Sequence, residues 1–154
     1  EKAEALGIPP GVWRRDLVNG QVVTLPDGRQ IHPDQVLGEL RPGARLVHVG
    51  DVGQTANLLE VCREADVLVI EATYLEAELE MARDFAHLTA RQAAELARDA
   101  GVKQLILTHI SRRYRERDVA AEAQAIFPDT SIARDFDLFQ VRRGECIRVK
   151  AGST

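Results

Sequence analysis

Apolar residues are irregularly spaced over the first 44 residues and regularly spaced from residue 45 onward. In the regular part, short apolar runs alternate with segments in which apolar residues recur every three or four positions. The runs predict strands at 45–50, 66–70, 104–108, 131–133 and 136–142, with 146–149 as a further candidate. The periodic segments predict helices at 55–65, 75–85, 89–100 and 118–127. This alternation favours right-handed crossovers and a mostly parallel sheet in an α/β layer.

Capping signals mark the ends of two of these helices. Thr89 with Gln92 three residues later forms a capping box, and Gly101 is suited to end the helix that follows. Asp118 is the expected N-cap of the next helix, and Pro128 is expected to end it. The sequence therefore predicts both limits of each helix.

The first 44 residues contain most of the turn-forming signals. They hold all but one of the six prolines, and Pro26-Asp27-Gly28 separates two short stretches at 21–25 and 29–32. This pattern predicts a small hairpin after an irregular arm. We therefore expect residues 1–44 to form an arm with a β ribbon, and residues 45–154 to form the α/β part.

Composition limits the class of protein. A chain of 154 residues with 45% hydrophobic residues and a net charge of -4 suits one globular domain or part of a larger one. No run is long and apolar enough to span a membrane, and Cys62 and Cys146 are too few for a disulfide framework. We therefore expect a cytoplasmic protein without membrane contact. Because the only methionine is Met81 and the first residue is Glu1, we also expect protein sequence upstream of this chain.

Titratable side chains follow three successive strands of the predicted sheet. Asp51, Glu71 and His109 each come directly after a strand, and His87 lies in the loop before the helix cap Thr89. The carboxyl ends of parallel strands meet at one edge of a sheet, so we expect these side chains to gather there. Two histidines with an aspartate and a glutamate are typical of a metal-assisted hydrolase. Each residue alone also fits an ordinary role, as a helix cap, an ion-pair partner or a hydrogen-bonded core histidine.

Two basic clusters could contact a polyanion. Arg14 and Arg15 adjoin Trp13, the only tryptophan, which can stack on a nucleobase or pack the arm against its neighbours. Residues 112–117 form the densest basic cluster of the chain, soon after His109. This second cluster also fits a solvated loop with an arginine–glutamate pair.

A series of short motifs resembles a known family. In chain order the motifs are Gly50-Asp51, Glu71-Ala72-Thr73, His87-Leu88-Thr89-Ala90, and Leu107-Thr108-His109-Ile110-Ser111 with Arg113-Tyr114. They resemble the C-terminal half of ribonuclease Z, a family of tRNA 3′-processing endonucleases in the metallo-β-lactamase superfamily. Residues 7–11 resemble the end of that family's flexible substrate-clamping arm. The resemblance implies the C-terminal half of an αββα sandwich, with two zinc ions at one edge.

The resemblance also implies a role for each residue of the expected site. Asp51 resembles the carboxylate that bridges both zinc ions, and His109 resembles the last histidine ligand. His87 resembles the histidine that donates a proton to the leaving 3′-oxygen, and Glu71 resembles the acidic residue that supports it. The residues expected to contact the substrate are Trp13, Arg14, Arg15, Thr89 and Arg113.

The sequence departs from the family pattern at several positions. Ile70, Val52 and Leu88 stand where the family has a histidine, a threonine and a serine. The His-x-His-x-Asp-His motif, which supplies most metal ligands in the family, does not occur in this chain. Because a catalytic zinc usually takes three protein ligands, we expect the chain alone to bind metal weakly and to be inactive. Its expected partners are the N-terminal half of the same protein, a second copy in a homodimer, and precursor tRNA.

The sequence therefore favours a zinc-dependent endoribonuclease that removes the 3′ trailer of precursor tRNA and leaves a 3′-hydroxyl. One alternative is another hydrolase of the same fold, such as a phosphodiesterase or an arylsulfatase-like enzyme that acts on small molecules. A second alternative is a non-catalytic half-domain that binds tRNA or dimerises. The presence of Asp51, His87 and His109 together argues against the second alternative, because a binding module needs no such group.

Overall fold

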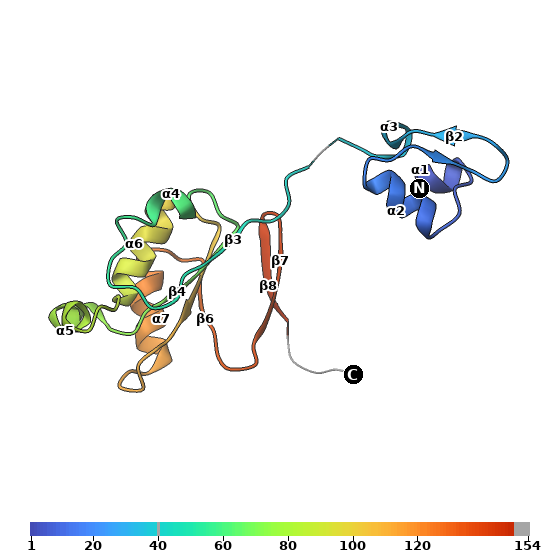
Figure 1. The fold of residues 1–154 in the computed structure, drawn as a ribbon. Coiled ribbons are helices and arrows are strands. Elements are labelled where there is room, and N and C mark those ends of the chain that lie inside the picture. The colour runs from blue at the N-terminus through green and yellow to red at the C-terminus, as the bar shows by residue number, and fades with distance from the viewer. Residues whose placement is uncertain (40, 150–154) are drawn as a thin grey trace. The chain divides into compact units, whose positions relative to one another are not determined.

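The computed structural model describes residues 1–39 and 41–149, and the chain forms two compact units. One unit is Glu1–Arg41 and the other is Pro42–Thr154, so the division falls just before the expected boundary at residue 44. Figure 1 labels helices and strands of both units. Each unit has its own hydrophobic core.

The Glu1–Arg41 unit is more helical than its prolines and glycines suggest. Its elements are α1 (Lys2–Ala5), α2 (Val12–Val18), β1 (Val23–Thr24), β2 (Gln30–Ile31) and α3 (Pro33–Val36). The two strands pair antiparallel, with Val23 opposite Ile31. The expectation of an irregular arm is wrong, because α1, α2 and α3 occupy part of it; Gly11, the N-cap of α2, has a φ of 107° that favours glycine.

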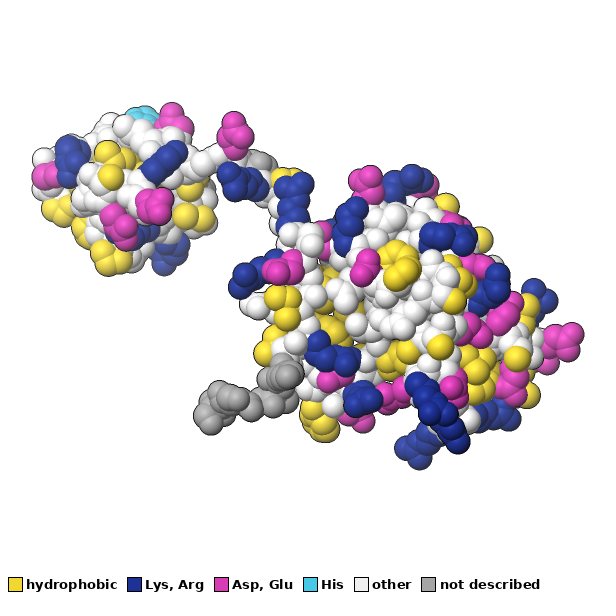
Figure 2. All heavy atoms as spheres, turned by 180° about the vertical axis from the view of Figure 1, so that it is seen from behind, with side chains coloured by type: hydrophobic (Ala, Val, Ile, Leu, Met, Phe, Trp, Pro, Cys, Tyr) yellow, Lys and Arg dark blue, Asp and Glu magenta, His cyan; other side chains and the backbone are white. Residues whose placement is uncertain are grey.

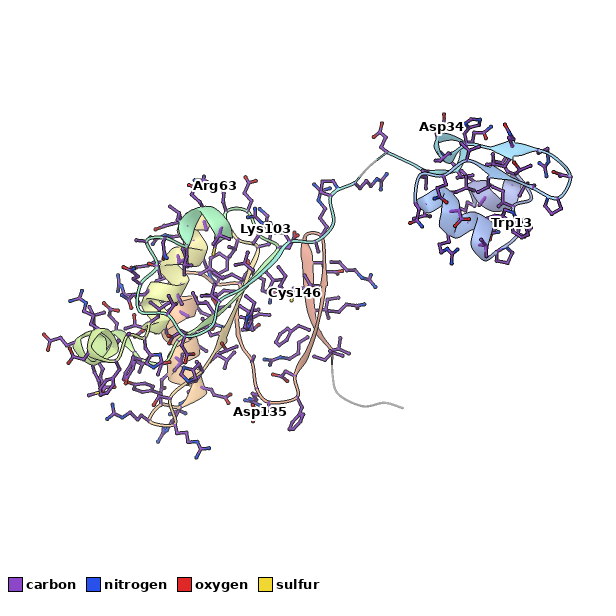
Figure 3. All side chains as sticks on the ribbon, in the orientation of Figure 1. Trp13, Asp34, Arg63, Lys103, Asp135 and Cys146 are labelled. Carbon is purple, nitrogen blue, oxygen red and sulfur yellow. The ribbon has the colours of Figure 1, made fainter. Side chains whose placement is uncertain are left out.

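A small apolar core stabilises this unit. Its buried members are Ile8, Leu17, Val23, Leu25 and Ile31. Trp13, which Figure 3 shows on α2, packs against this core and is partly buried. The tryptophan ring therefore contributes to the folding of its own unit.

The second unit is built on a four-stranded parallel sheet. Its strands, in spatial order, are β3 (Leu46–His48), β4 (Val67–Glu71), β5 (Gln104–Thr108) and β6 (Thr130–Ile132). Glu71 at the end of β4 lies opposite Thr108 at the end of β5. The predicted α/β class with a parallel sheet is confirmed, and the register aligns the carboxyl ends of the central strands.

Helices connect the strands of this sheet. They are α4 (Leu59–Cys62), the 3₁₀ helix η1 (Glu76–Glu78), α5 (Leu79–Asp84), α6 (Ala90–Ala100) and α7 (Glu116–Gln124). The capping box of Thr89 and Gln92 is confirmed, as is Gly101, which ends α6 in the left-handed conformation. Asp118 is not the cap of α7, because that helix begins earlier and Arg115 is its N-cap. The helix predicted at 55–65 contracts to α4, since Glu64 takes a positive φ of 54° and turns the chain toward β4.

The main core lies between the sheet and the helices. Figure 1 shows α6 and α7 running along the same side of the sheet, and α6 contacts both β4 and β5. The buried side chains of α6 are mostly alanines, which allow the helix to lie close to the strands. Leu68 and Ile70 of β4 and Leu105 and Leu107 of β5 fill the space beneath them. This packing fixes the strand ends that carry the candidate site.

The last two strands form a separate hairpin. β7 (Leu138–Arg142) and β8 (Glu145–Val149) pair antiparallel with each other. Asp66 attaches the hairpin to the sheet, because its carboxylate accepts hydrogen bonds from the backbone N–H of Gly144 and of Arg45, each at 2.7 Å. These bonds, led by the one from Arg45, hold the pKa of Asp66 below its ordinary value.

The surface of the larger unit carries charges of both signs. Figure 2 shows acidic and basic side chains interspersed over the visible face, as the small net charge suggests. Within residues 1–39 and 41–149, no helix has the length and apolarity needed to cross a membrane.

Candidate metal centre

Four titratable residues gather at the carboxyl edge of the sheet. Glu71 is the last residue of β4, His109 directly follows β5, and Asp51 lies in the loop after β3. His87 reaches the same place from the loop before α6, and its ring centroid lies 5.1 Å from that of His109. The structure therefore brings together the three residues that the strand ends selected and His87, which was expected from the loop before Thr89.

Three of these residues could hold a metal ion. Asp51, His87 and His109 each offer one ligand atom, and these atoms lie within 4.8 Å of one another. Imidazole nitrogen and carboxylate oxygen are donors that zinc accepts. The donor set therefore fits a divalent transition metal.

The Asp51 and His109 side chains are open to solvent. Asp51 Oδ1 lies 3.3 Å from His109 Nδ1, and the two side chains are 61% and 50% exposed. His109 has a φ of 53°, which is uncommon for a residue other than glycine. The exposed side chains leave the cluster accessible to a ligand.

Close packing of two loops brings Asp51 toward His87. An added Cβ at Gly53 would lie only 3.0 Å from Cα of Ala86, the residue before His87. The loop after β3 can therefore approach the loop before α6 only because position 53 is glycine. A larger residue there would separate the two halves of the cluster.

Glu71 supports the cluster from beneath. Its side chain is 1% exposed, and Oε1 accepts a hydrogen bond from Val52 N–H at 2.9 Å and lies 2.9 Å from His87 Nδ1. Burial alone would raise the pKa of Glu71, but hydrogen bonds from Thr73, Val52 and His87 outweigh it and lower the pKa below its ordinary value. The group is therefore an ionised carboxylate at neutral pH, aligned with His87.

Thr73 belongs to the site, although no role was predicted for it from the sequence. Its hydroxyl lies 2.6 Å from Glu71 Oε2, 2.9 Å from His109 Nδ1 and 3.4 Å from His87 Nδ1. The only signal in the sequence is its place in the Glu71-Ala72-Thr73 motif. A threonine two residues beyond a strand end is common and does not by itself indicate a site. The contacts of Thr73 with His87 and His109 appear only in the three-dimensional structure.

Thr89, which was expected to contact the substrate, is buried and caps α6. It is fully buried, its Oγ1 accepts a hydrogen bond from Gln92 N–H at 3.1 Å, and the hydroxyl donates to Glu76 at 2.7 Å. The expected substrate contact is not available to a side chain with this burial. Thr89 instead fixes the start of α6, two residues after His87.

Arg113 is held against the segment before His87. Its Nη1 lies 3.5 Å from Glu78 Oε1 and 2.8 Å from Met81 Sδ, and the Tyr114 hydroxyl donates to the same Glu78 carboxylate. The Arg113 side chain remains 53% exposed. It can therefore position the loop after His109 and still present charge to solvent.

The other residues expected to contact the substrate lie in the Glu1–Arg41 unit. Arg14 donates two hydrogen bonds to the Ile8 carbonyl, at 3.0 and 2.8 Å, which ties α2 to the preceding turn. Arg15 is 69% exposed and interacts with Asp16 at 3.3 Å. Of the two arginines, Arg15 has the more accessible guanidinium group.

Comparison with known proteins identifies the class of this fold. Residues 22–110 match the family described as the beta-lactamase superfamily domain, and the chain belongs to that superfamily. A metallo-beta-lactamase fold protein from Bacillus subtilis has the same fold: the alignment covers 68% of this chain and 39% of that protein, with a TM-score of 0.55 and 20% identity. The fold class expected from the sequence is thereby confirmed.

Curated relatives identify the particular group within this class that the chain resembles. The ribonuclease Z of Bradyrhizobium sp. (strain ORS 278) is 49% identical over 141 residues, which are 92% of this chain and 47% of the relative. The ribonuclease Z of Enterococcus faecalis is 43% identical over 144 residues, again 92% of this chain and 46% of the relative. The resemblance to ribonuclease Z is confirmed, and the chain spans about half the length of these relatives.

Proposed function

We propose that this chain is the C-terminal half of a zinc-dependent endoribonuclease that removes the 3′ trailer of precursor tRNA and leaves a 3′-hydroxyl. The observation that carries the proposal is the convergence of Asp51, His87 and His109 above the buried Glu71. The ribonuclease Z relatives supply the class of substrate.

Asp51 and His109 are the proposed metal ligands of this chain. When bound, zinc would supply hydroxide near neutral pH and stabilise the negative charge that develops on the phosphate. A catalytic zinc usually takes three protein ligands, so one aspartate and one histidine do not complete two sites. The remaining ligands would come from the N-terminal half of the same protein.

His87 is the proposed proton donor to the leaving 3′-oxygen. Its Nδ1 lies 2.9 Å from Glu71 Oε1, and this contact orients the ring. Protonation of the leaving oxygen avoids the expulsion of an alkoxide. Glu71 thus acts on the reaction through His87.

The basic residues are proposed to bind the tRNA. Arg113 lies in the loop that follows His109, and a positive charge there suits a phosphate group near the scissile bond. Trp13, Arg14 and Arg15 of the Glu1–Arg41 unit would contact the tRNA away from that bond, across a homodimer as in the ribonuclease Z family. Arg15 offers the most exposed charge of this set.

Cleavage of precursor tRNA by the full-length protein tests this proposal. The variant His87→Ala should lower kcat by about 100-fold or more, in the range that general acid catalysis contributes. His48→Ala is the matched control, because His48 is exposed on β3 and lies outside the cluster. Equal activity of both variants, or activity on bis-p-nitrophenyl phosphate with none on precursor tRNA, would contradict the proposal.

A further inference from the structure

Thr73 lies between the two histidines of the cluster. Its Oγ1 is within hydrogen-bonding distance of Glu71 Oε2, at 2.6 Å, and of His109 Nδ1, at 2.9 Å. Thr73 is 8% exposed and Glu71 is 1% exposed, so water has little access to either group. The hydroxyl has one proton to donate, and its acceptor must therefore be a neighbouring protein group.

The direction of the hydrogen bond to Glu71 follows from its surroundings. Each carboxylate oxygen faces a backbone donor, since Oε1 accepts from Val52 N–H at 2.9 Å and Oε2 faces Thr73 N–H at 3.3 Å. Such a setting suits an ionised carboxylate, which can only accept. The Thr73 hydroxyl therefore donates to Glu71 at 2.6 Å in preference to the neutral carbonyl of His109 at 3.0 Å.

With its proton directed at Glu71, Thr73 Oγ1 can only accept from His109. Nδ1 of His109 must then carry hydrogen, and Asp51 Oδ1, 3.3 Å from the same nitrogen, is also an acceptor. His87 Nδ1 donates directly to Glu71 by the same reasoning, at 2.9 Å. In the neutral form both rings then keep the lone pair of Nε2 free.

We propose that Thr73 is a positioning residue that connects Glu71 to His109, so that one buried carboxylate sets the tautomer of both histidines. The contact with His87 is direct, whereas the contact with His109 passes through the Thr73 hydroxyl. A histidine can ligate a metal only through an unprotonated nitrogen, and a fixed hydrogen bond at the other nitrogen holds its orientation. The effect on catalysis rests on the proposed function, but the tautomers themselves do not.

Nitrogen NMR of the metal-free protein, labelled with ¹⁵N at histidine, tests the proposal. Long-range proton correlations distinguish a ring protonated at Nδ1 from one protonated at Nε2, and His87→Gln and His109→Gln variants assign the signals. Thr73→Val removes the hydroxyl at nearly constant size, and Thr73→Ser retains it. Thr130→Val is a matched control, because the buried Thr130 hydroxyl donates to the Phe127 carbonyl, away from the cluster.

In the wild-type protein we expect both histidines to be protonated at Nδ1. Thr73→Val should shift His109 toward the Nε2-protonated form and leave His87 unchanged, whereas Thr73→Ser and Thr130→Val should leave both unchanged. An unchanged His109 in a folded Thr73→Val protein would overturn the proposal. A wild-type His109 protonated at Nε2 would overturn it without any variant, even if Thr73→Val does not fold.

Kinetics of the full-length protein separate this role from a structural one. Thr73→Val should lower kcat for precursor tRNA by about 10–100-fold, the range found for residues that orient metal ligands, with little change in KM. Thr73→Ser should recover most of that loss, and Thr130→Val should keep wild-type kcat. If the tautomers behave as expected but the full-length protein does not cleave precursor tRNA, the proposed function fails and the positioning role of Thr73 remains. If the full-length protein cleaves precursor tRNA and Thr73→Val leaves kcat unchanged, the effect of Thr73 on catalysis is excluded.

Discussion

At the scale of single residues, the buried carboxylate of Glu71 organises the cluster. It is 1% exposed and has hydrogen-bonding partners on both oxygens, including Val52 N–H at 2.9 Å and the Thr73 hydroxyl at 2.6 Å. A buried charge is tolerated in a protein only when such partners compensate for lost hydration. The residue therefore affects both the stability of the fold and the orientation of His87.

Replacement of Glu71 should reveal both effects. Glu71→Gln places an amide N–H₂ group opposite one of the existing donors, so we expect the free energy of unfolding to fall by about 1–3 kcal/mol in urea titrations. The kcat for precursor tRNA should fall by about 10–100-fold. Glu80→Gln, an exposed change on α5, is the control and should alter neither. Wild-type stability of Glu71→Gln would show that these buried hydrogen bonds contribute little.

The sequence predicted which residues form this cluster better than it predicted the hydrogen bonds between them. Asp51, Glu71 and His109 could be selected because each lies at a strand end, and strand ends are visible in the apolar pattern. Thr73 could not, since its importance depends on two histidines, 14 and 36 residues further along the chain. Thr89 was recognised as a helix cap, but its complete burial and its hydrogen bond to Glu76 become visible only in the tertiary structure.

At the scale of secondary-structure elements, the prediction succeeded where the residues of the element itself define its type and its ends. The strand at 104–108 and helix α6 agree with the prediction because a continuous apolar run, a capping box and a C-terminal glycine define them. α2 was missed because its core contacts lie outside its own segment. A strand was predicted at 136–142 and a further candidate at 146–149, and only the tertiary structure shows that β7 and β8 pair with each other.

The link between the sheet and the β7–β8 hairpin should depend on pH. Backbone donors of Arg45 and Gly144 lower the pKa of Asp66 in the folded protein, so the carboxylate is more acidic when folded than when unfolded. Its stabilising contribution is complete above the unfolded pKa and is lost as pH falls through the folded pKa. Urea titrations from pH 7 down to about pH 3 should therefore show declining stability.

Asp66→Asn provides the comparison. An asparagine has one acceptor oxygen, so it cannot accept from both backbone donors in the same way. We expect a lower urea midpoint at neutral pH and a shallower decline below about pH 4. Asp129→Asn serves as a control, because Asp129 participates in the fold through its backbone carbonyl. A wild-type pH profile for Asp66→Asn would contradict the role given to this carboxylate.

At the scale of the whole molecule, the chain consists of two units that carry different candidate functional residues. The Glu1–Arg41 unit has a core of its own and carries Trp13, Arg14 and Arg15, while the larger unit carries the metal-competent cluster. Within the smaller unit, the two arginines differ in environment. Arg14 bonds to the Ile8 carbonyl, whereas Arg15 is 69% exposed.

This difference predicts separate consequences for the two arginines in the full-length protein. Arg15→Ala should weaken precursor tRNA binding and reduce the slope of affinity against salt concentration by about 1, as expected for the loss of one phosphate contact. Arg14→Ala should also lower the melting temperature of the Glu1–Arg41 unit, because two hydrogen bonds to Ile8 are lost. Filter binding at several salt concentrations and circular dichroism measure these effects. Unchanged affinity in both variants would exclude the arm from tRNA binding.

Zinc binding and cleavage, measured together on this chain and on the full-length protein, test the central claim most directly. We propose that Asp51 and His109 supply one part of a metal centre beside His87, and that other residues of the same protein complete it. We predict weak, substoichiometric zinc binding and no cleavage of precursor tRNA by the 154-residue chain, and tight zinc binding with cleavage by the full-length protein. Stoichiometric zinc and repeated turnover by the 154-residue chain alone would contradict the account.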